Sequence, residues 1–282
     1  MFDRLSRSWE LVKASAAVLR ADKELVVFPI VSATLSIFVF LTFLVPMLLA
    51  GVFDSTVTGR SGFSVVGYLV GFLFYVVQYT VIFFCNTALV GAALIRLRGG
   101  DPTVADGFRI AWSRFRAILG YALIAATVGM ILRAIAERVG FIGKLVVAAI
   151  GFTWNVATYL VVPVLVVENV GPVDAIKRSA SYLRKTWGEQ IIGNLGLGTA
   201  FGLLTIGTVL SGILLFIGAA MTGSVALMVT VGVLLIAALI AIALISSALS
   251  GVYAAAVYRY AAEGETGTFF TADMVRGAFR QK

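Results

Sequence analysis

Few polar residues in this sequence could do chemistry, and they lie inside long apolar segments or at their edges. The candidates are three amides and one carboxylate: Asn86, Asn155, Glu168 and Asn194. Together they could line a polar cavity that is open at one end, with Glu168 facing Arg178 or Arg184 at its mouth. Alternatively, the amides form hydrogen bonds between helices, each contributing about 0.6 kcal/mol, and Glu168 forms an ordinary ion pair. We favour the second interpretation and keep the first as the sharper hypothesis.

Several kinds of catalysis are disfavoured by the residues that the sequence lacks. It has no histidine, and its one cysteine, Cys85, lies inside an apolar segment, so no internal disulfide can form. Without histidine, neither the common metal-ligand sets nor a Ser–His pair can be assembled. The fourteen acidic residues lie at the ends of apolar segments or outside them, whereas proton relays in membranes need buried ionisable groups. We therefore expect no enzyme activity, no metal site, no cofactor and no proton coupling.

Six apolar segments must position these residues, and five of them reach the length of about 20 residues that crosses a bilayer. They are Leu25–Phe53, Phe63–Ile95, Ala117–Leu132, Leu145–Val167, Ile191–Met221 and Val225–Tyr258, of which the third is the shortest. Hydrophobic residues make up 60% of the chain and charged residues only 13%, which is far from the composition of a soluble domain. The sequence predicts an all-α integral membrane protein with six spans, and Pro163 should kink the fourth.

The distribution of basic residues between the segments predicts the orientation. Eighteen of the 22 lysines and arginines lie before the first segment, after the second, after the fourth or after the sixth. Basic residues are retained in cytoplasmic loops, so we expect a multi-pass protein of the cell membrane with both termini in the cytoplasm. This topology would place Asn86, Glu168 and Asn194 in the cytoplasmic half of the membrane.

Three of these basic connections have apolar residues every three or four positions, which is typical of amphipathic helices. They are residues 1–24, Asp101–Arg116 and Gly171–Gly188, and the second opens with Asp101-Pro102-Thr103, a helix-start pattern. Each precedes a pair of spans, so the unit of helix, span and span could be repeated three times. The alternative is that any helical hairpin entering from the basic side acquires such a helix.

We expect the amphipathic helices to form a basic collar on the inner leaflet. The residues expected to contact lipid headgroups are Arg4, Arg7, Lys13, Arg114, Arg116, Lys177, Arg178 and Arg184. The net charge of +8 could also suggest nucleic acid, but basic residues beside membrane spans have anionic headgroups as their nearer partner. We therefore expect membrane lipids, and no nucleic acid, as partners.

A distinctive run of residues surrounds the fourth segment: Trp154-Asn155, Pro163-Val164-Leu165, Glu168, Gly171-Pro172, Ala175, Arg178-Ser179 and Trp187-Gly188. Together with the later Tyr258-Arg259-Tyr260-Ala261 and Glu263-Gly264, this run resembles an uncharacterised family of prokaryotic six-span membrane proteins, a domain of unknown function. The resemblance implies the six-span fold but no reaction or ligand. A looser similarity is to the membrane portion of some glycerophosphodiester phosphodiesterases, whose catalytic domain this chain lacks.

These observations predict a single transmembrane domain over residues 1–282. It would comprise an amphipathic helix (1–24), a six-span bundle (25–258) and a cytoplasmic tail (259–282). The function we expect is non-enzymatic: binding or organising lipid, or scaffolding partners, at the inner leaflet. The alternative is a channel or uncoupled transporter that works as a homo-oligomer. Glycine pairs such as Gly198 and Gly202 let helices approach closely, which packing within the six-helix bundle explains, with homo-oligomerisation as the second interpretation.

Overall fold

Helix is the only regular secondary structure in the residues that this computed structural model describes, which are 13–49, 65–185 and 190–264. Helical residues 13–21 come first. The elements that follow are η1 (Lys23–Val26), α2 (Val27–Leu49), α4 (Val65–Leu97), α5 (Val104–Ser113), α6 (Phe115–Arg138), α7 (Phe141–Ala157), α8 (Val161–Glu168), α9 (Pro172–Lys185), α10 (Gln190–Met221), α11 (Val225–Tyr258) and η2 (Arg259–Glu263).

Within the described residues, six stretches of helix are long and apolar enough to cross a membrane, which confirms the predicted number. They are Lys23–Leu48, Leu69–Leu97, Phe115–Arg138, Phe141–Glu168, Phe201–Met221 and Val225–Glu263. The third is longer than its apolar core of Ala117–Leu132, because helix α6 continues through charged residues at both ends and reaches 24 residues. The fourth is interrupted between α7 and α8.

The described chain divides into two compact units. One boundary between them falls within α4, which contributes residues to both. The first unit comprises Met1–Val26, Ala93–Asp101 and Thr186–Lys282, and the second comprises Val27–Ala92 and Pro102–Lys185. The prediction of one transmembrane domain stays a prediction.

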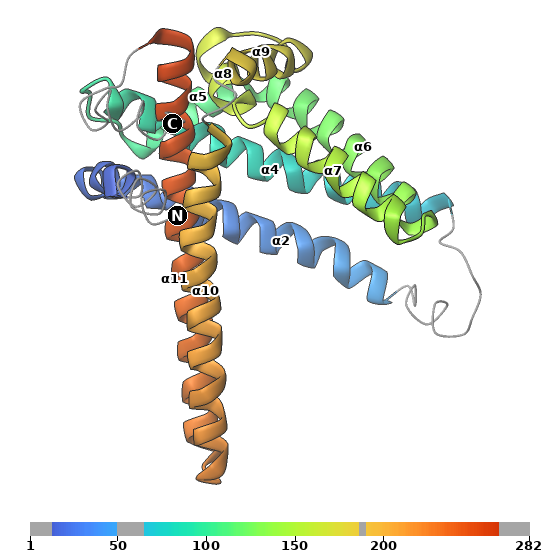
Figure 1. Ribbon diagram of the computed structural model, residues 1–282, viewed down its shortest axis with the longest axis vertical. Helices are drawn as coiled ribbons and strands as arrows, with labels where there is room; N and C mark the ends of the chain where they lie inside the picture. Colours follow the sequence, from blue (N-terminus) through green and yellow to red (C-terminus); the bar gives the residue numbers. More distant parts are fainter. Residues whose placement is uncertain (1–12, 50–64, 186–189, 265–282) are drawn as a thin grey trace. The chain divides into compact units, whose positions relative to one another are not determined.

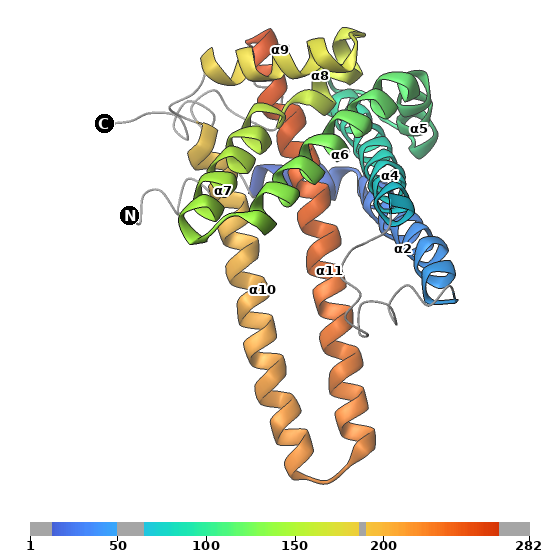
Figure 2. The same ribbon diagram turned by 90° about the vertical axis from the view of Figure 1, so that its right-hand side faces the viewer.

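Within the first unit, α10 and α11 form a long antiparallel hairpin that ends in a tight turn (Figures 1 and 2). The Ser224 hydroxyl caps the start of α11 by accepting a hydrogen bond from the Leu227 backbone N–H at 3.4 Å. Most side chains in the apolar window of each helix are exposed, as expected for segments whose solvent is lipid.

The C-terminal end of α4 belongs to the same unit and is closed by a Schellman turn. Gly99 has a φ of +87°, a left-handed conformation in which glycine has no steric penalty. The Gly99 N–H donates to the Arg96 carbonyl and the Gly100 N–H to the Ile95 carbonyl, both at 3.0 Å. The Arg259 guanidinium adds a buried bond from Nη1 to the Leu97 carbonyl at 2.6 Å. These donors satisfy carbonyls that a helix end leaves free.

Within the second unit, α6 and α7 run antiparallel (Figures 1 and 2) and both contact α9. Helix α5 packs closely on α2 and α4 at Gly107, where an added Cβ would lie 2.5 Å from the Phe28 ring and 2.8 Å from the Ala88 carbonyl. Phe84 of α4 contacts Phe108 and Trp112 of α5. The aromatic side chains of α4 are therefore part of the packing between helices.

Candidate functional site

The fourth span is broken at Thr158–Leu160, and a serine from α9 bridges the break. Pro163 cannot donate a backbone hydrogen bond, and its ring would clash with the carbonyl of Tyr159 in a continuous helix. The chain therefore starts a new helix, α8, with Pro163 in its first turn, where the missing N–H costs little. The buried Ser179 hydroxyl donates to the Ala157 carbonyl at 2.7 Å and accepts from the Leu160 N–H at 3.1 Å. The predicted kink at Pro163 is thus a complete interruption.

Helix α8 ends in a turn that brings Glu168 back against α9. Asn169 adopts the left-handed conformation, with a φ of 49°, and α9 begins at Pro172. The Glu168 side chain is only 11% exposed and pairs with Arg178 Nη1, and Tyr182 donates its hydroxyl to Glu168 Oε1 at 2.9 Å. Burial raises the pKa of Tyr182, and the hydrogen bond to Glu168 raises it further. The hydrogen bond to Glu168 likewise raises the pKa of Arg178, so the guanidinium stays charged.

Arg114, at the junction of α5 and α6, contacts the C-terminal end of α8. Its Nη1 donates to the Asn169 side-chain oxygen, and its Nη2 lies 3.4 Å from the Val166 carbonyl. Both acceptors belong to the C-terminal end of α8, where a cation is favourable because the helix dipole places partial negative charge there. We name Arg114, Glu168, Asn169, Arg178, Ser179 and Tyr182 the α8–α9 corner.

Helix α5 presents a different kind of surface. Thr103 caps its start: the Thr103 hydroxyl accepts from the Asp106 N–H at 3.2 Å, and Asp106 accepts from the Thr103 N–H at 3.1 Å. The hydrogen bond from the Thr103 side chain, followed by that from its backbone, lowers the pKa of Asp106. This capping box confirms the helix start that the sequence predicted. Gly107 and Ala111 are buried on one side of α5, while Trp112 is 70% exposed on the other.

The four candidate cavity residues have different surroundings. Glu168 meets Arg178, one of the two partners that the sequence proposed. Asn155 is exposed on α7 and Asn86 is partly buried in α4, while the side chain of Asn194 lies outside the described residues. No common cavity is established by these positions, so the cavity stays a prediction.

The residues expected to contact headgroups fall into three groups. Arg114 and Arg178 already have protein partners. Lys13, Arg116, Lys177 and Arg184 are exposed, although Lys177 lies 3.9 Å from Asp174. Arg4 and Arg7 lie outside the described residues. Their contact with lipid headgroups stays a prediction.

Sequence reasoning missed the roles of Ser179 and Tyr182 and the burial of Asp22. Ser179 belonged to the motif that carried the family resemblance, but a serine on a helix has no distinguishing pattern. The signal that could have found it is the pairing of a proline in a span with a hydroxyl on the next helix, since a break frees backbone groups that need partners.

The part of the chain that the structure describes has helix as its only regular secondary structure and six stretches long and apolar enough to cross a membrane, which indicates the class of multi-pass membrane proteins. The chain belongs to a family of unknown function, DUF6159, whose model matches residues 65–269 and so includes the whole α8–α9 corner. No curated protein matches the sequence, and the looser similarity to the phosphodiesterase membrane portion finds no support.

Proposed function

We propose that the protein is a non-enzymatic membrane protein of the cell membrane that binds and organises anionic lipid at the cytoplasmic leaflet. Both termini would be cytoplasmic, as the 18 basic residues on one side of the spans suggest. Scaffolding of protein partners at the same surface is compatible with this role.

The exposed face of α5 is the single observation that carries the proposal. Trp112 is the most exposed tryptophan that the structure describes, and it stacks on Phe115 with ring centroids 5.5 Å apart. Arg109 of α5 and Arg116 at the start of α6 are also exposed, and Arg109 pairs with Asp106 at 3.0 Å. Tryptophan with arginine favours the region between water and acyl chains, because the ring is amphipathic and the guanidinium pairs with phosphate.

The proposal is tested by measuring the lipid bound to the full-length protein after charge is removed from α5 and from the start of α6. Each basic residue near an anionic surface contributes about 1 kcal/mol. In nanodiscs of mixed anionic and zwitterionic lipid, the double substitution Arg109→Gln and Arg116→Gln should reduce the anionic lipid retained by the protein several-fold, as measured by native mass spectrometry.

The control is Arg133→Gln, which removes the same charge near the opposite end of α6, where Arg133 donates to Glu137 Oε1 and to the Tyr75 hydroxyl, both at 3.0 Å. This variant should retain the lipid of the parent protein. An equal loss in both proteins would mean that total charge, rather than α5, attracts the lipid.

The alternative function is an oligomeric channel or uncoupled transporter, and the break in the fourth span is the observation that supports this alternative. Discontinuous helices commonly form binding sites in transporters. An oligomer could pack through the α10–α11 hairpin, where Phe201, Thr205, Ile242 and Ser246 line part of a hollow of about 610 Å³. Solute or ion flux into liposomes that contain only this protein would support the alternative, and its absence would leave the lipid role.

A further inference from the structure

Asp22 is a buried carboxylate at the junction between helical residues 13–21 and η1. It is only 6% exposed, although its neighbours Ala21 and Lys23 are exposed. Its Oδ1 accepts a hydrogen bond from the Glu24 N–H at 3.2 Å. Its Oδ2 is inaccessible to solvent and has no hydrogen-bond partner. A buried ionised oxygen without a donor is costly, whereas a protonated oxygen becomes a donor itself.

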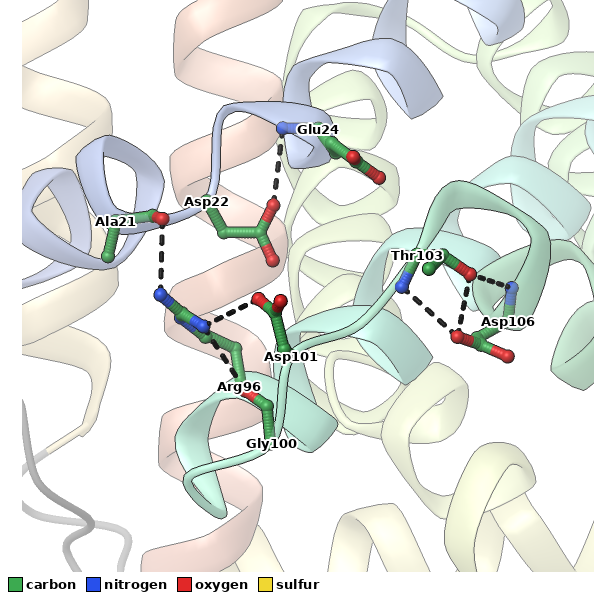
Figure 3. A network of polar contacts seen from close by, with 8 residues as sticks. All are labelled: Ala21, Asp22, Glu24, Arg96, Gly100, Asp101, Thr103 and Asp106. Carbon is green, nitrogen blue, oxygen red and sulfur yellow. Dashed lines mark hydrogen bonds and ion pairs between the residues drawn. The ribbon is translucent and has the colours of Figure 1, made fainter.

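The charged groups around Asp22 come from the end of α4 as well as from its own segment. Arg96 donates to Asp101 Oδ1 at 2.9 Å, to the Gly100 carbonyl at 3.3 Å and to the Ala21 carbonyl at 3.1 Å. In Figure 3 the Oδ2 atom of Asp22 points toward the carboxylate of Asp101, with the Arg96 guanidinium beside both. The Asp101 side chain is 96% exposed.

The other charged groups of this region are engaged with one another. η1 contacts α11, and beyond the end of α11 Glu263 pairs with Arg98 at 2.6 Å and with Arg259 at 3.3 Å. The groups whose charges act on Asp22 are therefore Arg96, Glu24 and Asp101. Arg96 is the one cation among these groups, and Asp101 is the carboxylate to which it donates.

We propose that Asp22 is a proton-binding site, in which the protonated carboxyl directs its O–H toward the Asp101 carboxylate while Arg96 remains on Asp101. Ionisation of Asp22 would create a second carboxylate competing for Arg96, the residue that also holds the Ala21 carbonyl. Proton binding would therefore control how firmly residues 13–21 are held to the end of α4. This inference is independent of lipid binding and does not require proton movement across the membrane.

The electrostatic surroundings agree with this assignment. Burial raises the pKa of Asp22 above 3.8, the Glu24 N–H and Arg96 oppose the rise, and the carboxylates of Glu24 and Asp101 add to it. The folded protein then holds a proton that the unfolded chain releases. Its stability should fall as the pH rises from 3.8 through the folded pKa, and Asp22→Asn should remove this fall.

The test is pH-dependent infrared difference spectroscopy on the full-length protein in nanodiscs. We expect a protonated-carboxyl C=O band that titrates above pH 3.8 and is lost in Asp22→Asn. Asp174→Asn, at an exposed carboxylate, should keep the band. Asp101→Asn should move the titration to lower pH, because it removes a neighbouring negative charge and leaves Arg96 available to Asp22.

The Asp101→Asn shift keeps the test valid if Asp22→Asn does not fold. A band that survives Asp22→Asn, or a titration unmoved by Asp101→Asn, would overturn the proposal.

Discussion

At the scale of single residues, a substitution at Glu168 can distinguish the ion-pair interpretation from the cavity hypothesis. It accepts hydrogen bonds from Arg178 and Tyr182, and its side chain is only 11% exposed. Glu168→Gln keeps the shape and removes the charge. Because the carboxylate helps to keep the Tyr182 phenol neutral, this variant should lower the pKa of Tyr182, while burial still holds it above 10.0.

The measurement is the ultraviolet titration of tyrosinate, with Tyr182→Phe subtracted to isolate one of nine tyrosines. Glu137→Gln, at the exposed pair with Arg133, should leave the Tyr182 titration unchanged. If Glu168→Gln has no effect on Tyr182 but changes retained lipid or flux, the ion-pair interpretation is wrong and the cavity hypothesis gains support.

At the scale of elements, the corner where α7, α8 and α9 meet depends on one buried hydroxyl. Ser179→Ala leaves both the Ala157 carbonyl and the Leu160 N–H without their partner. An unsatisfied buried polar group costs about 1–3 kcal/mol, so the free energy of unfolding should fall by roughly that amount. Denaturant unfolding of the detergent-solubilised protein measures the change.

Ser113→Ala is the matched control, because the exposed Ser113 hydroxyl bonds only within its own helix, to the Ile110 carbonyl at 2.7 Å. We expect a change within about 0.5 kcal/mol there, as for an ordinary surface substitution. Equal effects of the two alanines would show that water or lipid replaces Ser179 at the break.

At the scale of the whole molecule, the orientation of the spans can be tested directly. Single cysteines at Ser8, Gly223 and Gln281, in a Cys85→Ala background, are exposed to an impermeant maleimide in intact cells. The distribution of basic residues predicts that the position at Gly223 reacts and the other two react only after lysis. Labelling of the cysteine at position 8 or 281 in intact cells would contradict the predicted orientation.

The six long helices could be predicted from the sequence because each depends on local information. Apolar length sets a span, Thr103 and Asp106 satisfy each other across one helical turn, and Pro163 disrupts its own helix. The family membership likewise follows from residues that can be read along the chain.

The partners of the polar residues were decided by tertiary structure. Sequence left Glu168 with a choice between Arg178 and Arg184, and the left-handed turn at Asn169 determines which side of α9 faces it. Ser179 reaches a break 19 residues earlier in the chain, and Asp22, within a run of charges that suggested exposure, is buried. Such contacts depend on where helices end and at what angle they meet, and periodicity and composition do not encode that geometry.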